Sequence, residues 1–280
     1  MPSAYLPSRS FVRVSGPEAQ DFLQGLITTD VESMPPNQAR PGALLTPQGK
    51  ILFDFLIWRD GDGFLVETDN EQVEALVRRL TMYKLRAAVT LTTADEQGVS
   101  LFWGDEARAA EVKDAAFAKA GTELSRKPGK HTDGPKDAYL TLRVESGIPS
   151  AGPDYALQDA FPHDVLLDKT DGLSFRKGCY VGQEVVSRMQ HRGTARRRVA
   201  LVSGQSALPA SGTEIIAGGK PVGTLGSVAG NKALAIVRID RVGDAITAGT
   251  PITAGDVPVT LSLPEWTELS FPTDAQEAEQ

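Results

Sequence analysis

Hydrophobic and polar positions follow two different repeats in the first part of the chain. Helical spacing begins after Ser15, a plausible N-cap, with apolar residues at positions 19, 22, 23 and 26. It begins again after Asp69 or Asn70, either of which can cap a helix with apolar residues at 73, 76, 77 and 80. Two apolar runs, residues 51–58 and 64–66, flank an Asp-Gly-Asp-Gly sequence and therefore predict a β-hairpin.

Shorter patterns complete this region. Strands are expected over residues 87–91, 99–103 and 139–145, the last because Leu140, Leu142 and Val144 alternate with polar residues. The alanine-rich stretch 106–120 is expected to form a helix. Polar, proline-containing stretches at 34–42 and 126–137 are expected to be loops. Helices and strands mixed with a hairpin predict an α+β domain rather than a doubly wound parallel sheet.

The pattern changes after Arg198. No helical repeat is found there, and β-branched runs separated by glycine-rich turns predict a small all-β barrel or sandwich. The runs cover residues 198–202, 213–217, 222–228, 233–239 and 257–263. We therefore expect an α+β region over residues 1–195, a C-terminal β-barrel over 196–264, and an acidic, disordered tail over 265–280.

Composition narrows the functional classes. The 280 residues carry a formal net charge of −7, which argues against a general nucleic-acid binder. The basic run Arg192, Arg196, Arg197 and Arg198 is then better interpreted as a solvated turn or a local anion contact. A single cysteine excludes an internal disulfide and suits a reducing compartment. Neither a signal peptide nor a membrane-length apolar run is recognisable, so a cytoplasmic location and no membrane contact are expected.

Common catalytic and cofactor motifs are missing from the sequence. There is no dinucleotide-binding glycine fingerprint, no P-loop and no nucleophile elbow. His131, His163 and His191 lie far apart and match no zinc spacing. One cysteine cannot hold an iron–sulfur cluster by itself, so any cluster would need ligands from a partner or a second copy. We expect no metal site made by this chain alone.

The most distinctive stretch is residues 177–184, Lys-Gly-Cys-Tyr-Val-Gly-Gln-Glu, which contains the single cysteine. Apolar residues recur every four positions from Val181, so a glycine-bent loop is expected to enter a short helix near Gly182. Cys179 would then lie just before the helix N-terminus, near Arg176 and Lys177, and both features favour a thiolate. The alternative is that Cys179 is a small buried hydrophobe, as free cysteines usually are.

Three carboxylates are further candidates. Asp54 lies within an apolar strand, where a carboxylate is costly without a partner or a purpose. Glu145 is expected to end a strand, and Glu184 belongs to the cysteine stretch. The alternative for each is an outward-facing, solvated acid or a structural ion pair, such as Glu145 with a neighbouring arginine.

The stretch 177–184 resembles the signature K-G-C-[FY]-x-G-Q-E of YgfZ-type folate-binding proteins. These are relatives of the aminomethyltransferase, or T-protein, of the glycine cleavage system, and the family includes mitochondrial iron–sulfur maturation factors. Within the signature, the matching residues are Lys177, Gly178, Cys179, Tyr180, Gly182, Gln183 and Glu184. Further matching blocks follow in the expected order at residues 24–31, 46–50 with Asp54, 83–86, 143–149 and 161–162.

The resemblance implies an α+β, T-protein-like fold of three subdomains in a ring, with tetrahydrofolate in the central channel and a small C-terminal β-barrel. Glu145 matches the glutamate that hydrogen-bonds the pterin, a sensible role because a carboxylate accepts paired N–H groups. Asp54 matches the second aspartate of the catalytic pair in T-proteins. Phe53 replaces the first aspartate, and this departure counts against full transferase chemistry.

The remaining assignments follow the same resemblance. Arg86 and the arginines at 196–198 are candidates for the acidic tail of folate, and Tyr180 and Glu184 for further folate contacts. Cys179 and Asp54 are the candidate catalytic residues.

The resemblance implies a folate-dependent factor that assembles or repairs iron–sulfur enzymes and so supports tRNA modification indirectly. In this role Cys179 supplies a thiolate to a transient cluster or adduct, and scaffold or target proteins are the partners. The alternative is an aminomethyltransferase or a related one-carbon transferase, in which Cys179 has no task. A direct tRNA contact fits the acidic charge poorly.

Overall fold

The computed structural model describes residues 2–107, 112–193 and 195–272, and its internal contacts divide the chain into two compact units. Unit 1 contains Met1–Tyr139 and Leu167–Ser187. Unit 2 contains Leu140–Leu166 and Arg188–Gln280. Both units are discontinuous in sequence, because the chain leaves unit 1 after Tyr139 and returns to it for the segment that carries Cys179.

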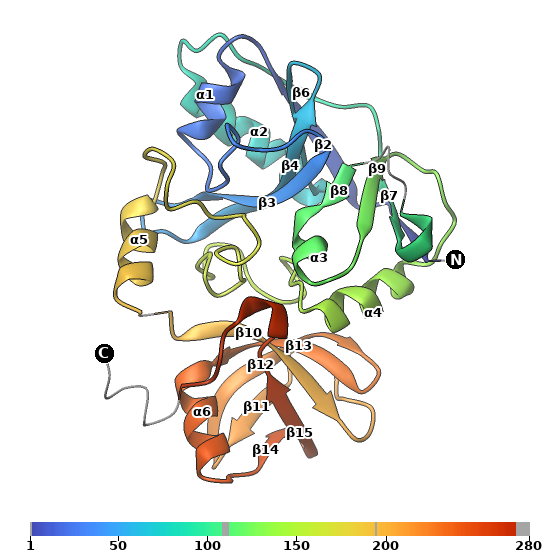
Figure 1. The fold of residues 1–280 in the computed structure, drawn as a ribbon, viewed down its shortest axis with the longest axis vertical. Helices are drawn as coiled ribbons and strands as arrows, with labels where there is room; N and C mark the ends of the chain where they lie inside the picture. The colour runs from blue at the N-terminus through green and yellow to red at the C-terminus, as the bar shows by residue number, and fades with distance from the viewer. Residues whose placement is uncertain (1, 108–111, 194, 273–280) are drawn as a thin grey trace. The chain divides into compact units, whose positions relative to one another are not determined.

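Unit 1 is built on a nine-stranded sheet with the order β1-β7-β9-β8-β3-β4-β5-β2-β6 (Figure 1). Neighbouring strands are antiparallel except for the parallel pair β3 and β8. The strands are β1 (Ser3–Leu6), β2 (Arg9–Ser15), β3 (Gln38–Leu45), β4 (Ile51–Asp60), β5 (Gly63–Asp69), β6 (Thr90–Thr93), β7 (Val99–Trp103), β8 (Val112–Asp114) and β9 (Leu124–Pro128). The helices are α1 (Ala19–Gln24), α2 (Asn70–Lys84) and α3 (Ala115–Lys119), and α4 (Lys136–Ser146) and α5 (Gln183–His191) cross the boundary between the units.

The predicted hairpin and the helix after it are confirmed. β4 and β5 pair in register and meet at the Asp60–Gly63 turn, where Gly61 adopts a φ of 57°. Asp69 caps α2 by accepting a hydrogen bond from the Glu71 amide at 3.0 Å. One face of α2 is buried in the core of unit 1 through Val73, Leu76 and Leu80.

Unit 2 contains a closed six-stranded barrel, which confirms the predicted C-terminal β-structure. Its strand order is β10-β13-β12-β11-β14-β15 (Figure 1). The strands are β10 (Arg197–Gly204), β11 (Glu214–Ala217), β12 (Lys220–Ala229), β13 (Lys232–Arg238), β14 (Ile252–Ala254) and β15 (Val257–Ser262). Alternate side chains such as Ile215, Leu225 and Val237 fill the barrel core, while their neighbours along the strands point outward.

Two element predictions in unit 1 are wrong. Residue 15 ends β2, and the first helix begins later, with Glu18 at its N-cap. The stretch 106–120 is not one helix. A 3₁₀ turn covers Gly104–Glu106, residues 108–111 lie outside the described part, and β8 follows before the short helix α3. The remaining differences are shifted ends: the strand expected at 87–91 lies at Thr90–Thr93, β3 begins inside the loop expected at 34–42, and β9 ends inside the one expected at 126–137.

The expected strand over 139–145 is a helix, α4, and this error moves Glu145 from a strand end to a helix. The alternation of Leu140 and Val144 also fits the i, i+4 spacing of a helix, and the buried face of α4 holds Arg143 and Val144. The barrel region also contains a helix that was not expected, α6 (Ile239–Thr247).

The tail expected to be disordered from residue 265 begins with ordered residues. Glu265–Thr267 forms a 3₁₀ turn, Thr267 is buried, and Trp266 Nε1 donates to the Ser146 carbonyl at 2.9 Å. Residues 273–280 lie outside the described part. The expected boundary at 195 differs from the division into units, because residues 140–166 pack with the barrel. Independent domains at 1–195 and 196–264 therefore stay a prediction.

The length and apolar content of the helices bear on membrane contact. Within the described residues, no helix is long and apolar enough to cross a membrane.

Candidate functional site

The segment that leads to Cys179 is bound to the loop between α1 and β3 in unit 1. Thr28 Oγ1 donates to the Gly172 carbonyl at 2.6 Å, and the Ser174 amide donates to the Thr28 carbonyl at 3.0 Å. Ser174 Oγ in turn accepts from the amide of Lys177 at 3.2 Å and closes a local turn. The approach to the cysteine is therefore fixed by both backbone and side-chain hydrogen bonds.

Lys177 extends this attachment with a buried ammonium group. Its Nζ donates to the carbonyl oxygens of Ile27 at 2.9 Å and Thr29 at 2.8 Å. Burial lowers the pKa of Lys177 to about 8, and the Asp30 carboxylate offsets only part of this effect. The sequence placed Lys177 as a charge beside the thiol, whereas in the structure its charge points into backbone carbonyls. Its position makes it an anchor of the loop.

Tyr180 belongs to the same packing. It is buried, its hydroxyl donates to the Ser174 carbonyl at 3.3 Å, and its ring lies 5.4 Å from Lys177 Nζ. Burial also raises the pKa of the Tyr180 hydroxyl. These contacts give Tyr180 a structural task, and its role as a folate contact stays a prediction.

Gly182 fixes the far end of the loop, directly before α5. Its φ of 80° is unfavourable for other residues, and an added Cβ would lie 2.5 Å from the Thr46 carbonyl oxygen and 3.2 Å from Gly49 Cα. The β3–β4 turn at residues 46–50 therefore packs directly against the motif. Three blocks that carried the family resemblance, 24–31, 46–50 and 177–184, are brought together around one loop.

Cys179 itself is exposed, and so are Gly178 and Glu184. This excludes the alternative in which Cys179 is a small buried hydrophobe. The predicted helix after the motif is confirmed as α5, with Gln183 as its first residue and the buried Val186 beneath it. The loop thus presents its thiol to solvent on a fixed base.

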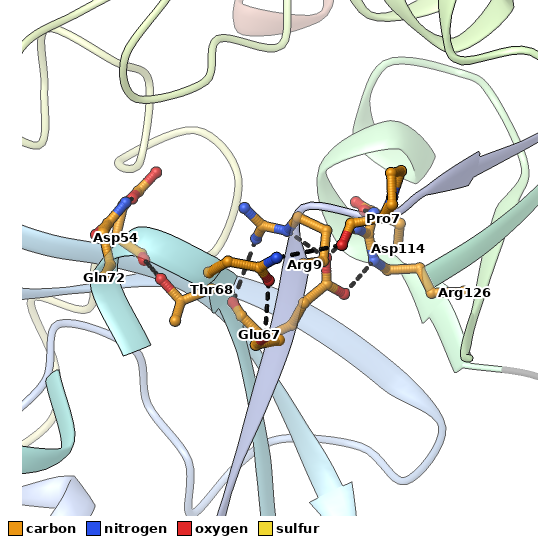
Figure 2. Close-up of polar contacts among 10 residues, drawn as sticks. Pro7, Arg9, Asp54, Glu67, Thr68, Gln72, Asp114 and Arg126 are labelled. Atoms are coloured by element: carbon orange, nitrogen blue, oxygen red, sulfur yellow. Dashed lines mark hydrogen bonds and ion pairs between the residues drawn. The ribbon is translucent and has the colours of Figure 1, made fainter. Parts of the chain in front are cut away.

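Asp54 lies on β4, on the face opposite its buried neighbours Phe53 and Phe55. Its Oδ1 accepts a hydrogen bond of 3.3 Å from Gln72 Nε2 on α2, and its carbonyl accepts one of 3.0 Å from Thr68 Oγ1 (Figure 2). Among the described residues, the buried Gln72 Oε1 finds no hydrogen-bond partner. A carboxylate and an unsatisfied amide oxygen therefore lie side by side.

A buried ionic network that the sequence analysis missed continues from this point along the sheet (Figure 2). The Arg126 guanidinium forms two hydrogen bonds with Glu67, of 2.6 and 2.9 Å, and one of 2.9 Å with Asp114. Arg9 Nε adds a bond of 2.9 Å to Glu67. All three groups of the Arg126 cluster are almost fully buried.

The charges of this network shift its pKa values in different directions. Burial raises the pKa of Glu67, but the cations Arg126 and Arg9 outweigh it and hold that pKa below its ordinary value. Burial dominates at Asp114 and raises its pKa, although Arg126 opposes the shift. The sequence does not point to this network, because Glu67 follows the apolar run 64–66 and begins the polar stretch Glu-Thr-Asp.

Glu145 lies on α4 and belongs to unit 2. Its side chain is 46% exposed and pairs with Lys232 at 2.7 Å, so an ion pair is present, although its partner is a lysine. Its neighbour Arg143 is buried and bonds Ser227, Asp154 and the Ile148 carbonyl. Arg143 is therefore a buried residue whose hydrogen bonds join α4 to other segments of unit 2. Glu145, two residues later, remains partly exposed to solvent.

The candidate arginines are dispersed. Arg86 is exposed just after Leu85, which adopts a φ of 46° at the end of α2. In unit 2, Arg197 bonds Asp159 at 3.0 Å and Asp164 at 2.7 Å, and Arg198 donates to the His163 carbonyl at 2.7 Å. The charge of Arg196 lowers the pKa of Asp240, although burial and hydrogen bonds act more strongly on that carboxyl. No group of three potential metal ligands occurs among the described residues.

Comparisons with known proteins give this geometry a context. Residues 196–269 match the family model described as the CAF17 C-terminal β-barrel domain. The chain is 33% identical over 220 residues to an iron–sulfur cluster assembly factor IBA57 homologue of Pyricularia oryzae, with 69% of this chain and 55% of that protein covered. It is 29% identical to the mouse and human IBA57 iron–sulfur cluster assembly factors, covering 97% and 93% of this chain and 86% and 84% of theirs.

The solved structures identify the fold. The aminomethyltransferase T of the glycine cleavage system from Bartonella henselae matches with a TM-score of 0.70 and 16% identity, over 96% of this chain and 87% of that one. The chain therefore has the expected aminomethyltransferase-like α+β fold with a C-terminal barrel.

The length of the relatives and their described location also bear on what the sequence predicts. The matched region spans about half the length of the fungal relatives. The expected cytoplasmic location is wrong, because the similar proteins from P. oryzae, mouse and human are all described as mitochondrial.

Proposed function

We propose that this protein is a YgfZ-type, folate-binding factor for the assembly or repair of iron–sulfur enzymes, with Cys179 as its functional thiol and scaffold or target proteins as its partners. The observation that carries the proposal is the exposed Cys179 on a loop held by Lys177, Thr28 and Gly182. The similarity to iron–sulfur cluster assembly factors over most of the chain supports the same process. Any effect on tRNA modification would be indirect, through the enzymes served.

The arrangement suits a thiol that acts on another molecule. An exposed thiol can reach a partner's cluster, whereas one cysteine per chain leaves most ligand positions of a cluster to that partner. The hydrogen bonds that hold the preceding loop reduce the entropy lost when the thiol engages a partner.

Tetrahydrofolate is the cofactor that the family resemblance implies, and the residues present fit parts of it. A pterin offers N–H donors, and the Asp54 carboxylate beside Gln72 Oε1 offers acceptors in unit 1. In unit 2, Glu145 offers a half-exposed carboxylate. Arg86 is a candidate for the acidic tail, and Glu184 for a further contact. Bound folate would supply one-carbon chemistry at its nitrogens, while these residues would orient it.

Folate binding is tested by calorimetry with tetrahydrofolate. Glu145→Ala should weaken binding by at least ~1.5 kcal/mol, because a charge-assisted hydrogen bond is lost. Glu268→Ala, which removes another exposed carboxylate of unit 2, is the matched control and should leave affinity unchanged. Equal affinities for wild type and Glu145→Ala would remove Glu145 from the folate site.

The cellular function is tested by complementation. A strain that lacks the related assembly factor receives wild type, Cys179→Ala, Cys179→Ser or Asp54→Ala, and the activity of an iron–sulfur enzyme is measured. Loss with both cysteine variants and retention with Asp54→Ala supports the assembly role. Loss with Asp54→Ala alone would instead favour one-carbon transfer, the activity of enzymes with this fold. Full activity of both cysteine variants would contradict a functional thiol.

A further inference from the structure

Unit 2 contains a cavity of about 450 Å³ that none of the proposed functions uses. One wall comes from barrel strands β11, β12 and β13, and a second wall comes from residues of the segment 154–160. Its volume lies within the range of small-molecule sites. Both walls belong to the same compact unit, so the cavity is a feature of that unit alone.

Strand register places a row of side chains on the cavity wall. Glu214 pairs with Thr224, and Thr224 pairs with Ile236 on the next strand. Arg238, two residues further along β13, points to the same side as Ile236. All four line the cavity, while the alternate residues fill the barrel core.

The two ends of this row are a guanidinium and a carboxylate that keep hydrogen-bonding groups for a ligand. Arg238 uses Nε and one terminal nitrogen, at 2.9 and 2.5 Å, on Asp240. Among the described residues, no partner is found for its other terminal nitrogen, nor for the Glu214 carboxylate at the opposite end. Arg197 faces Arg238 across the β10–β13 pair, but Asp159 and Asp164 already neutralise it.

The distance between these ends suits a small molecule. Two strand spacings separate Glu214 from Ile236, and two residues along β13 add the step to Arg238, so the two α-carbons are about 12 Å apart. Both side chains can reach inward over the apolar Ile236, which lies between them in the row, and Tyr155 also lines the cavity. The lining therefore offers a guanidinium, an apolar middle and a carboxylate.

We propose that this cavity binds a small zwitterion, a free amino acid with an apolar side chain, whose carboxylate meets Arg238 and whose ammonium meets Glu214. A phosphate group fits less well, because the Glu214 carboxylate in the lining would repel it, while the charge of Arg197 is already balanced by Asp159 and Asp164. The inference does not depend on folate binding or on Cys179.

The test is calorimetry of the full chain with L-leucine, L-phenylalanine and L-methionine. Each amino acid is compared with its N-acetyl derivative, which lacks the cation, and its amide, which lacks the anion. At least one free amino acid should bind, and both of its derivatives should bind about tenfold more weakly or worse.

Two variants test which residue binds the ammonium group and which binds the carboxylate of the amino acid. Glu214→Gln should abolish the preference for the amino acid over its N-acetyl derivative, and Arg238→Gln should abolish the preference over the amide. Lys220→Gln, an exposed cation on β12 outside the lining, is the matched control and should bind like wild type. Thermal unfolding checks that each variant is folded, and the exposed Glu214 gives a test that is independent of the Arg238–Asp240 pair.

Several results of these titrations would contradict the proposal. Failure of all three amino acids to bind overturns it, and so does equal binding of an amino acid and either derivative. Tight binding of inorganic phosphate would show an anion site instead.

Discussion

Unit 1 buries two cations in different ways, and the comparison separates two tasks. Arg126 lies between Glu67 and Asp114, so its charge is compensated by full opposite charges. Lys177 donates its hydrogen bonds to the carbonyl dipoles of Ile27 and Thr29, and the Asp30 carboxylate compensates its charge only in part. Consistent with this, the pKa of Arg126 is raised by its carboxylates against the effect of burial, whereas burial lowers that of Lys177 to about 8.

The difference in compensation predicts how each site responds when its cation is removed or loses its proton. Removing Arg126 would leave the buried Asp114 without its cation and Glu67 with Arg9 alone, and breaking a buried ion pair in this way is among the most costly changes in a protein interior. Lys177 can lose its proton and still donate two hydrogen bonds, because a neutral amine keeps two N–H groups. The Arg126 network therefore belongs to the sheet itself, and Lys177 holds the loop that carries the exposed Cys179.

The largest effect is expected for Arg126→Met. Glu67 and Asp114 would remain buried, so the free energy of unfolding should fall by about 3–5 kcal/mol, measured by urea denaturation. Arg126→Lys, which keeps the charge but loses the paired geometry, should fall between wild type and Arg126→Met. A loss under about 1 kcal/mol for Arg126→Met would contradict a stabilising role for the network.

A smaller and more local effect is expected for Lys177→Met. The carbonyls of Ile27 and Thr29 lose their donor, so stability should decrease by about 1–2 kcal/mol. Hydrogen exchange should accelerate at the Ser174 amide, which bonds Thr28 in the same attachment. Arg176→Met removes the neighbouring exposed cation and is the matched control. Unchanged exchange in Lys177→Met would show that the loop does not depend on this residue.

The smallest effect is a dependence on pH. Lys177 has a pKa of about 8 in the folded state against an ordinary 10.5, so between these values the unfolded chain binds more protons. The contribution of Lys177 to stability therefore increases as the pH rises from 8 to 10.5, by roughly 1 kcal/mol after allowance for solvent screening. The difference between wild type and Lys177→Met in urea midpoint should therefore be largest above pH 10.5 and should reach a constant minimum below pH 8. A difference that does not vary with pH would contradict a buried ammonium.

The sequence predicts the parts of the fold that depend on local signals. The β4–β5 hairpin follows from its Asp-Gly-Asp-Gly turn, and α2 follows from its Asp69 cap and apolar face. The secondary structure of short segments is harder to predict from the sequence. The stretch around Leu140 and Val144 fits both periods over so few residues, and only its packing inside unit 2 makes it a helix.

The candidate site was predictable as a set of residues and not as a set of contacts. The exposure of Cys179 and the docking of Gly182 against residues 46–50 depend on segments more than a hundred positions apart. The role of Lys177 was misjudged for the same reason, because its two carbonyl partners lie about 150 residues away. Arg126 gave no local signal, since its partners come from β5 and from the β8–α3 junction.

The distant attachment of the Cys179 loop also sets an order of folding. Every strand of the unit 1 sheet lies before residue 129, whereas the Thr28–Gly172 bond spans 144 residues. During synthesis from the N-terminus, the sheet can therefore form before the loop exists, and the long chain closure makes docking a late event. A newly made chain thus passes through a stage in which the sheet is complete and the thiol is still untethered.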